Sequence, residues 1–284
     1  MTLHKPVLVT GASSGIGEAI AVHLAHKGFK VFAGARRIEK LQSLSGMGGG
    51  QITPVALDVT DKASIETAMS QIAENGQPLY GLVNNAGISL VGPVERTDLD
   101  EWRQLYETNV FGIVAMVQAA LPQMREAGKG RIVNIGSVGG RIVAPFFGPY
   151  ASSKHAVEGV SDGLRRELKH HGVKVSLVRP GFINTPFGEQ EQESLSRYEA
   201  EGEPYAEQVR VFREWHGKGH PAAPGPMIVA EKVHHALTTE KPHSRYTVPS
   251  SYIGYLMLRN LMPSALVDRV FERTTGLDKL KDKS

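Results

Sequence analysis

Short apolar segments alternate with amphipathic segments along most of the chain. Apolar residues that recur every three or four positions predict helices, whereas short apolar runs predict buried strands. The predicted strands are Pro6–Thr10, Lys30–Ala35, Ile52–Leu57, Tyr80–Val83, Gly130–Ser137, Val173–Val178 and Ser244–Pro249. The helices predicted between them are Glu18–His26, Ser64–Ala73, Leu99–Met116, Tyr150–Lys169 and Glu231–Thr238. This alternation favours one α/β domain with a parallel sheet.

Composition and charge narrow the classes of protein to which the chain can belong. Its 284 residues are 41% apolar and 21% charged, which is ordinary for a soluble globular protein. The formal net charge is only +3 and no dense block of lysine and arginine occurs, so we expect no nucleic-acid partner. The absence of cysteine excludes disulfides and fits a reducing compartment, and we expect a cytoplasmic protein.

The sequence does not favour a metal site or a membrane span. The pairs His170-His171 and His234-His235 are adjacent in sequence instead of four residues apart on a helix, and no cysteine ligand is available. We therefore predict no metal. No uninterrupted apolar run reaches about 18 residues, and glycine soon interrupts the N-terminal run, so neither a membrane-spanning helix nor a signal peptide is expected.

A glycine-rich turn follows the first predicted strand. It reads Thr10-Gly11-Ala12-Ser13-Ser14-Gly15-Ile16-Gly17 and leads into the first predicted helix. Glycines let the backbone approach a ligand closely, and the free amides at the start of a helix favour a pyrophosphate. The turn therefore predicts dinucleotide binding, with a strand-to-helix turn that holds no ligand as the alternative.

The second predicted strand ends where a dinucleotide-binding fold meets the adenosine ribose. An acidic residue at this position would accept hydrogen bonds from the 2′-hydroxyl, whereas an arginine would pair with a 2′-phosphate. Ala35 occupies the acidic position, and Arg36 and Arg37 follow it. This favours NADP(H) over NAD(H), with a pair of solvated loop arginines as the alternative.

Two later strands also end in polar residues. Asn84-Asn85-Ala86-Gly87 follows the fourth predicted strand, and Ser137 ends the fifth. An open α/β sheet places its ligand at the carboxyl ends of its strands, so both amides are expected to bind backbone and the nicotinamide ribose. The Ser137 hydroxyl is placed to stabilise charge that develops on a substrate oxygen. An ordinary turn or a helix cap is the alternative in each case.

Tyr150 and Lys154 are four residues apart in a predicted helix. This spacing places a phenol and an ammonium on one face. A nearby positive charge lowers the pKa of a phenol from its usual value of about 10, and such a tyrosine can exchange a proton with an alcohol oxygen. A Tyr and Lys pair on a solvated helix face is the alternative.

Taken together and in this order, these motifs resemble those of the short-chain dehydrogenase/reductase family, over roughly residues 5–190. The resemblance implies a doubly wound Rossmann-type domain with a seven-stranded parallel sheet flanked by helices. It also implies hydride transfer between a nicotinamide cofactor and a secondary alcohol or ketone. The catalytic residues that it implies are Asn109, Ser137, Tyr150 and Lys154. Asn109 would distort its helix and hold a water that links Lys154 to solvent, unless it is a surface asparagine.

The resemblance also implies a set of residues that bind the cofactor. They are Gly11, Ser13, Ser14, Gly15, Ile16, Gly17, Arg36, Arg37, Asp58, Val59, Asn85, Ala86, Gly87, Tyr150, Lys154, Pro180, Gly181, Ile183 and Thr185. Asp58 would bind the adenine amine, or instead cap the next helix. The Ile183 amide and the Thr185 hydroxyl would contact the carboxamide and a phosphate, unless this segment is a simple turn.

Two segments depart from the family pattern. Residues 187–226 are acidic and then rich in proline and glycine, and we expect a mobile substrate lid that is too short and polar to hold its own core. Its candidate pocket walls are Phe187, Tyr198, Tyr205, Phe212 and Trp215. Residues 252–284 are expected to form an amphipathic tail that covers the cavity, contacts another subunit or touches a membrane surface. A similar tail in the type 1 17β-hydroxysteroid dehydrogenase and retinol dehydrogenase group suggests a bulky lipophilic substrate.

The predicted protein is thus an NADP(H)-dependent enzyme, expected to be a homodimer or homotetramer, that interconverts a lipophilic secondary alcohol and its ketone. One alternative is a dinucleotide-binding sensor or scaffold without turnover, which has no use for the Ser, Tyr and Lys set. Another is an enzyme of the same fold that epimerises or dehydrates nucleotide sugars. The glycine spacing and the chain length oppose it.

Overall fold

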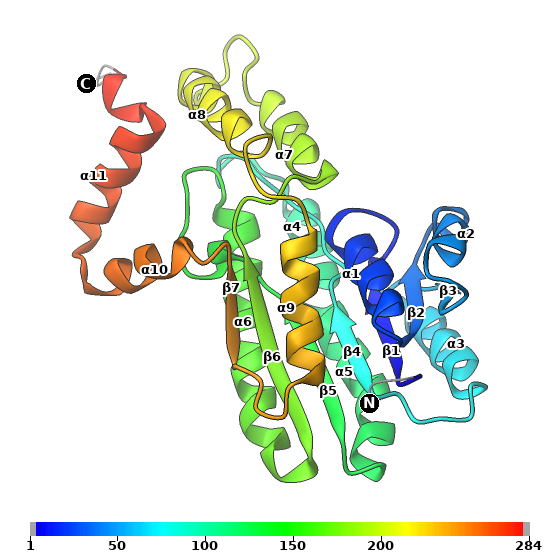
Figure 1. Ribbon diagram of the computed structural model, residues 1–284. Helices are drawn as coiled ribbons and strands as arrows, with labels where there is room; N and C mark the ends of the chain where they lie inside the picture. Colours follow the sequence, from blue (N-terminus) through cyan, green and yellow to red (C-terminus); the bar gives the residue numbers. More distant parts are fainter. Residues whose placement is uncertain (1–3, 281–284) are drawn as a thin grey trace.

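The computed structural model describes residues 4–280 and contains one seven-stranded parallel sheet. The strands are β1 (Pro6–Thr10), β2 (Lys30–Ala35), β3 (Ile52–Ala56), β4 (Gly81–Asn84), β5 (Gly130–Ile135), β6 (Val173–Pro180) and β7 (Arg245–Val248). Their order across the sheet is β3-β2-β1-β4-β5-β6-β7, and every neighbouring pair is parallel (Figure 1). The predicted fold class is confirmed.

The strand order reverses direction between β1 and β4. The chain builds outward from β1 through β2 to β3, and then returns to place β4 on the other side of β1. In an open parallel sheet, such a reversal leaves a crevice at the carboxyl ends of the strands. The fold therefore offers a ligand site at the ends of β1 and β4.

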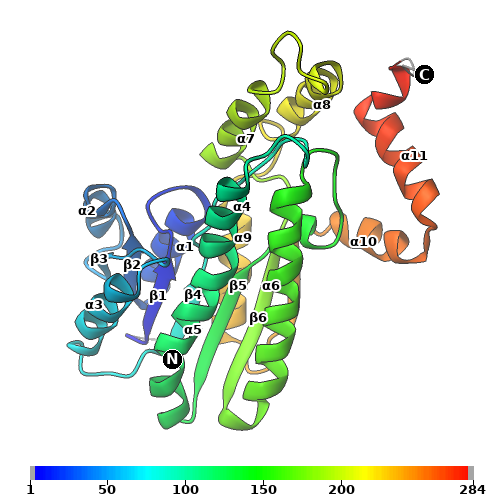
Figure 2. The same cartoon turned by 180° about the vertical axis from the view of Figure 1, so that it is seen from behind.

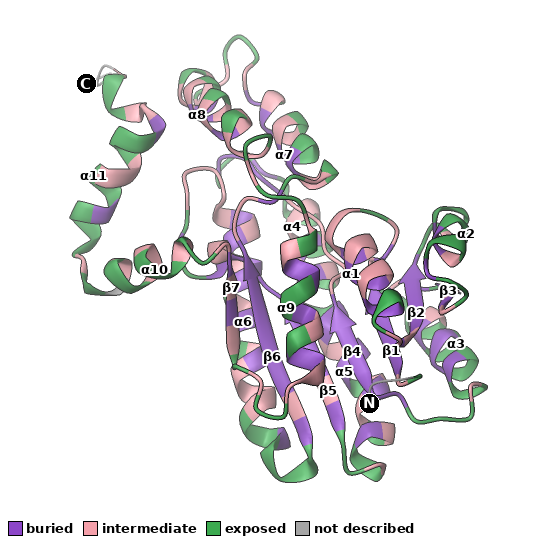
Figure 3. Ribbon diagram, viewed as in Figure 1, coloured by how far each residue is buried: buried purple, intermediate pink, exposed green. Residues whose placement is uncertain are grey.

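Helices cover both faces of the sheet. One face carries α1 (Gly15–His26), α2 (Ile38–Met47) and α9 (Met227–Thr238), and the other carries α3 (Lys62–Ala73), α5 (Gly112–Glu126) and α6 (Gly148–Glu167) (Figures 1 and 2). Side chains of β1 alternate between the two cores: Val7 and Val9 pack on the α1 side and Leu8 on the α3 side. Because both faces are covered, β1 and β4 at the centre of the sheet are buried along their whole length, as Figure 3 shows.

The helix α2 was not predicted from the sequence. Only Leu41 and Leu44 of this helix are buried, and the glycines from Gly46 onward favoured a loop. The helix nevertheless continues through Gly46 to Met47. Two buried leucines are too few to give a helical period that can be recognised in the sequence.

The sequence predicted one helix over Leu99–Met116, but the structure interrupts it with a different helical turn and ends it later in the chain. The structure has α4 (Leu99–Tyr106), a π-helical turn η1 (Glu107–Phe111) and then α5, which runs to Glu126. A π-helical turn inserts extra backbone into a helix and is frequent at functional sites. Short 3-10 turns occur at η2 (Val138–Gly140), η3 (Leu168–His171) and η4 (Leu277–Lys279).

Two helices, α7 (Pro186–Ser196) and α8 (Ala206–Gly219), stand above the carboxyl ends of the strands (Figures 1 and 2). We call residues 186–219 the α7–α8 segment. It shares a small core with loops of the main body, in which Val91, Phe146 and Phe147 pack with residues of both helices. Tyr198 and Phe212 are buried in this core, so they are not pocket walls.

The chain ends in α10 (Tyr252–Leu261) and α11 (Ser264–Thr275), which project from the end of β7 beside the main body (Figure 1). Several apolar side chains of α10 are exposed, including Met257 at 66% and Leu261 at 84%. Within residues 4–280, no helix combines the length and the apolar character needed to cross a bilayer.

Helix α6 is fixed to the sheet by a buried ion pair. Glu158 accepts hydrogen bonds from Arg179 of β6, with 2.7 Å between Oε2 and Nη2, and from Arg245 of β7 at 3.3 Å. The side chains of Glu158 and Arg179 are only 8% and 11% exposed. Removing one partner of such a pair leaves the other charge buried without compensation.

We expect Glu158→Ala to lower the free energy of unfolding by about 3–5 kcal/mol, because Arg179 would keep its charge but lose its partner. Urea denaturation followed by circular dichroism measures this loss. Glu167→Ala, at the exposed end of the same helix, is the matched control and should change stability by less than about 0.5 kcal/mol. Equal losses in the two variants would contradict the structural role of the pair.

Candidate active site

A cleft of about 610 Å³ lies along the carboxyl ends of the strands. The predicted site residues that line it are Gly11, Ser13, Ser14, Gly15, Ile16, Arg36, Arg37, Asp58, Val59, Asn85, Ala86, Gly87, Ser137, Tyr150, Lys154, Pro180, Gly181, Ile183 and Thr185. Gly17 and Asn109 do not line it and act from behind its walls. Segments far apart in the sequence thus converge on one site.

The glycine-rich turn is shaped by contacts with the end of β4. The Asn85 side-chain amide donates to the carbonyls of Thr10 and Gly11 at 3.0 and 3.1 Å, and Thr10 Oγ1 accepts the backbone amides of Asn85 and Ala86 at 3.0 Å. A Cβ atom on Gly17 would lie 2.2 Å from the Gly11 carbonyl oxygen. Gly11 and Gly15 have left-handed backbone, with φ of 65° and 59°. The turn is a close-fitting cradle, which suits a pyrophosphate at the start of α1.

Asn84 was expected to bind the ligand together with Asn85, and this expectation is wrong. Its side chain turns into the interior and donates to Asn134 Oδ1 at 2.9 Å, and Asn134 in turn donates to Ser161 Oγ at 2.9 Å. Asn84 is the last residue of β4, so its side chain points to the face opposite that of Asn85. It joins β4 and β5 to α6.

The end of the cleft beside β2 and β3 carries the candidate residues for adenosine. Arg36 and Arg37 are exposed there, and neither forms an ion pair within residues 4–280. Asp58 Oδ1 accepts hydrogen bonds from the Thr60 amide and hydroxyl at 3.0 and 2.8 Å. The residue that caps α3 is Asp61, so the alternative that Asp58 caps this helix is wrong.

Asn109 is fully buried in the π-helical turn, so the alternative of a surface asparagine is also wrong. Its Oδ1 accepts the Ile88 amide at 2.8 Å, and its Nδ2 donates to the Ile88 carbonyl at 2.9 Å and to Ser153 Oγ at 3.1 Å. Asn109 therefore ties the segment after β4 to α6, next to Lys154.

Ser137, Tyr150 and Lys154 meet at the floor of the cleft. The side chains of Tyr150 and Ser137 are hydrogen-bonded, and Ser137 Oγ also accepts the Gly139 amide at 3.0 Å. Lys154 Nζ lies 5.6 Å from the centre of the Tyr150 ring and donates to the Ile135 carbonyl at 3.1 Å. The helical spacing thus places the phenol and the ammonium in one volume.

The expected lowering of the Tyr150 pKa by Lys154 is not found in this structure. Burial raises the pKa of Tyr150 far above its usual value and the charge of Glu191 raises it further, against the hydrogen bond with Ser137. Burial also lowers the pKa of Lys154 from 10.5 to about 8. Burial disfavours both charged forms, and Lys154 directs its ammonium to the Ile135 carbonyl. At neutral pH, Tyr150 is therefore a protonated phenol and Lys154 a cation.

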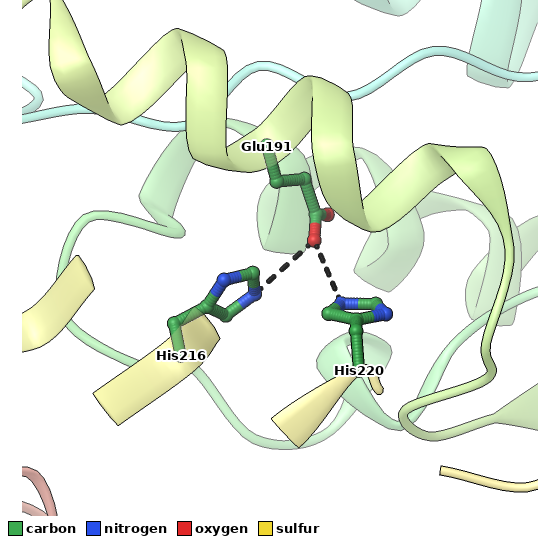
Figure 4. A group of neighbouring side chains, drawn as sticks. All are labelled: Glu191, His216 and His220. Carbon is green, nitrogen blue, oxygen red and sulfur yellow. Dashed lines mark hydrogen bonds and ion pairs between the residues drawn. The ribbon is translucent and has the colours of Figure 1, made fainter. Parts of the chain in front are cut away.

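Sequence reasoning missed three residues beside this site, Glu191, His216 and His220. Glu191 projects from α7 and accepts the Ser89 hydroxyl at 3.0 Å, and its other oxygen, Oε2, lies 3.2 Å from Nε2 of both histidines (Figure 4). Burial raises the pKa of Glu191, but contacts with the two imidazoles outweigh burial and lower it overall. The four-residue spacing of His216 and His220 was the signal in the sequence.

Two aromatic side chains flank the Tyr150 phenol. The Phe187 ring centre lies 5.9 Å from that of Tyr150, and the Phe147 ring centre lies 6.3 Å away. Phe187 was one of the candidate pocket walls and lines the cleft. The reacting end of the cleft is therefore partly apolar.

Comparison with known proteins identifies relatives over nearly the whole chain. The family model described as short chain dehydrogenase matches residues 5–196. The oxidoreductase YbbO of Escherichia coli K12 is 36% identical over 271 residues, which cover 95% of each chain. The NADPH-dependent 3-dehydrocapnine reductase of Ornithobacterium rhinotracheale is 34% identical over 285 residues, covering 98% of this chain and 99% of the relative. A short-chain dehydrogenase structure from Streptomyces avermitilis superposes with a TM-score of 0.77 at 33% identity, covering 97% of this chain and 96% of that one.

The close fit of Gly17 against the Gly11 carbonyl can be tested by adding a methyl group at residue 17. Gly17→Ala should abolish detectable binding of a nicotinamide dinucleotide, tested with NADPH, and lower stability by about 1–3 kcal/mol, since the new methyl group would overlap the Gly11 carbonyl. Intrinsic fluorescence titration and thermal unfolding measure the two effects. Gly159→Ala, in α6, is the control, because no atom lies within 4 Å of the added methyl position. Normal NADPH affinity in the Gly17 variant would refute the cradle.

Proposed function

Because the chain belongs to the short-chain dehydrogenase family of nicotinamide-dependent oxidoreductases, we propose that it interconverts a secondary alcohol and a ketone with NADP(H). The observation that carries this proposal is the Tyr150 hydroxyl, which is hydrogen-bonded to Ser137 beside the Lys154 ammonium. All three residues lie at the carboxyl ends of the strands, where a dinucleotide fold carries out its chemistry.

In the direction of reduction, Tyr150 donates its proton to the carbonyl oxygen of the substrate. Its raised pKa keeps that proton in place at neutral pH, so the residue is a general acid at the start of the reaction. Bound NADPH would supply the hydride. Ser137 donates a hydrogen bond to the same oxygen, and in the reverse direction the phenolate takes the proton of the alcohol.

Lys154 has two roles in this proposal. Its pKa of about 8 leaves it charged at neutral pH, and its ammonium stabilises the Tyr150 phenolate that forms as the proton leaves. It would also hold the nicotinamide ribose. Asn109 supports the proton relay through Lys154 and keeps Ile88 and Ser153 in place around it.

The residues at the end of β2 support the proposed preference for NADP(H) over NAD(H). Ala35 leaves no carboxylate there to repel a 2′-phosphate, and Arg36 and Arg37 lie exposed on the cleft. Either guanidinium can pair with a phosphate through two parallel hydrogen bonds. The relative from Ornithobacterium rhinotracheale is named as NADPH-dependent, which supports this choice.

A bulky lipophilic ketone suits the reacting end of the cleft, where Phe147 and Phe187 flank the phenol. The particular resemblance to hydroxysteroid and retinol dehydrogenases is not confirmed by the relatives compared. We propose that residues 187–226, which contain α8 and nearly all of α7, form the substrate lid. We also propose that α10 and α11 cover the cavity, contact another subunit of a homodimer or homotetramer, or touch a membrane surface. The exposed apolar side chains of α10 support a contact of this kind.

A sensor or scaffold that binds dinucleotide without turnover is the second candidate. Against it stands the cost of burying the Lys154 ammonium, because a protein that only binds cofactor gains nothing from a buried ammonium beside a phenol. Oxidation of NADPH on addition of steroid, retinoid, acyl or aryl ketones separates the two candidates.

Tyr150→Phe should lower kcat at least about 100-fold, since the phenyl ring has no proton to donate, and should leave the Kd for NADPH nearly unchanged. Ketone-dependent loss of NADPH absorbance measures turnover, and fluorescence measures affinity. Tyr205→Phe, which removes a hydroxyl bonded to Glu95, is the control and should keep full activity. Near-normal turnover in the Tyr150 variant would show that another group supplies the proton.

Arg36→Ala should weaken NADP binding by about 10- to 100-fold, because a charge-assisted pair with the phosphate is lost. NAD has no 2′-phosphate, so its Kd should change less than about threefold. Titration of the same variant with both nucleotides makes NAD the internal control. Equal losses for the two nucleotides would place the 2′-phosphate away from Arg36, and Arg37→Ala then tests the neighbouring guanidinium.

A further inference from the structure

The side chains of Glu191, His216 and His220 form a buried cluster between α7 and α8, and we propose that they bind one Zn²⁺ ion or a similar transition-metal ion. Glu191 and His216 are 4% and 1% exposed, and His220, at 16%, also lines the cofactor cleft. The cluster lies beside Ser137, Tyr150 and Lys154 and contains none of the residues proposed to carry out the hydride transfer.

The separation of the Glu191 oxygen from each imidazole nitrogen is close to that between ligands of a tetrahedral ion. Zinc lies about 2.0–2.2 Å from imidazole nitrogens and carboxylate oxygens, so neighbouring ligand atoms are about 3.3–3.5 Å apart. Glu191 Oε2 lies 3.2 Å from Nε2 of His216 and 3.2 Å from Nε2 of His220. All three donor atoms lie within 4.8 Å of one another, and Figure 4 shows the two rings directed at the same oxygen. Small side-chain rotations would make room for an ion among them.

The hydrogen bond that His220 makes through Nδ1 leaves its Nε2 available as a metal ligand. Nδ1 faces the carbonyl oxygen of Ile183 at 3.1 Å, so Nδ1 carries the hydrogen and donates it. In the neutral ring, Nε2 then presents a lone pair toward Glu191. Histidines that bind metals commonly donate their second nitrogen to a backbone carbonyl in this way.

His216 provides an independent observation. Its Nε2 has no assigned hydrogen-bond partner among the described residues, and its 3.2 Å contact with Glu191 Oε2 is that of an ion pair. An unsatisfied polar atom that is fully buried is costly, and a cation at the centre of the cluster would satisfy it.

The other ring nitrogen of His216, Nδ1, contacts the Gln192 side chain, which can accept its hydrogen once the amide group is turned over. Nδ1 lies 2.7 Å from the Gln192 side-chain amide. With a metal on Nε2, Nδ1 carries the hydrogen, so the Gln192 oxygen must turn toward it. This rotation gives up only the long 3.3 Å hydrogen bond from Gln192 to the Arg213 carbonyl.

The donor types select the kind of ion. Two imidazoles and one carboxylate suit zinc and related transition metals, whereas calcium and magnesium prefer oxygen ligands alone. His216 lies in α8, His220 is the residue that follows the end of this helix, and Glu191 lies in α7, so the ion would join the two helices. The prediction from the sequence was that no metal binds, and it considered only histidines adjacent in sequence.

The test measures metal binding by the full chain without NADPH or substrate. Protein treated with a chelator and desalted is titrated with ZnCl₂ by calorimetry, and bound zinc is counted after dialysis. We expect one ion per chain. Co²⁺ should give the intense visible absorption of a four- or five-coordinate complex. Glu191→Gln, His216→Asn and His220→Asn should each weaken Zn²⁺ binding at least about 100-fold.

The control is the double variant His170→Asn and His171→Asn, which removes two exposed imidazoles and should bind zinc as the unaltered chain does. Circular dichroism checks folding, and if a buried variant does not fold, His220→Asn decides, since its ring is the most exposed of the three. The absence of stoichiometric binding at micromolar free Zn²⁺, or unchanged affinity in His220→Asn, overturns the proposal and leaves the cluster as an ion pair.

Discussion

The site depends on one face of α6. Tyr150, Lys154 and Glu158 follow one another at intervals of four residues, so they share a side of the helix. The first two supply the candidate chemistry, and the third holds the helix to β6 and β7 through Arg179 and Arg245. A buried ammonium is costly, and the Ile135 carbonyl offsets only part of that cost. The anchor at Glu158 is what keeps this unfavourable group in place.

The opposite wall of the cleft is set by hydrogen bonds that cross the sheet. Asn85, after β4, and Thr10, at the end of β1, are joined by hydrogen bonds through both of their side chains. The absence of a side chain at Gly17 lets the glycine-rich turn approach the end of β4. Asn109 forms a similar link between Ile88 and α6. Each wall is therefore defined by polar contacts between segments distant in sequence. The cleft keeps its shape only while these contacts persist.

Features that depend on local sequence could be predicted, and those that depend on distant partners could not. The strands, the glycine turn and the Tyr150 and Lys154 pair have short-range signatures, because their periods are read within a few residues. The inward turn of Asn84 requires knowledge of Asn134, and the helix distortion at Asn109 was implied by the family resemblance and not by the local pattern. The sequence predicted a lowered pKa for Tyr150, whereas the structure raises it. The spacing of Tyr150 and Lys154 reveals a neighbouring charge, but it does not reveal the desolvation of the phenol.

The α7–α8 segment is coupled to the cofactor cleft by a small number of polar contacts. Glu191 accepts the Ser89 hydroxyl after β4, Ser194 Oγ donates to the Val91 carbonyl at 3.0 Å, and His220 bonds the Ile183 carbonyl after β6. Ile183 lines the cleft, so a displacement of α8 breaks a contact with a cleft wall. Movement of the segment would therefore disturb the loop after β6. Any group that ties α7 to α8 acts on the cleft through His220.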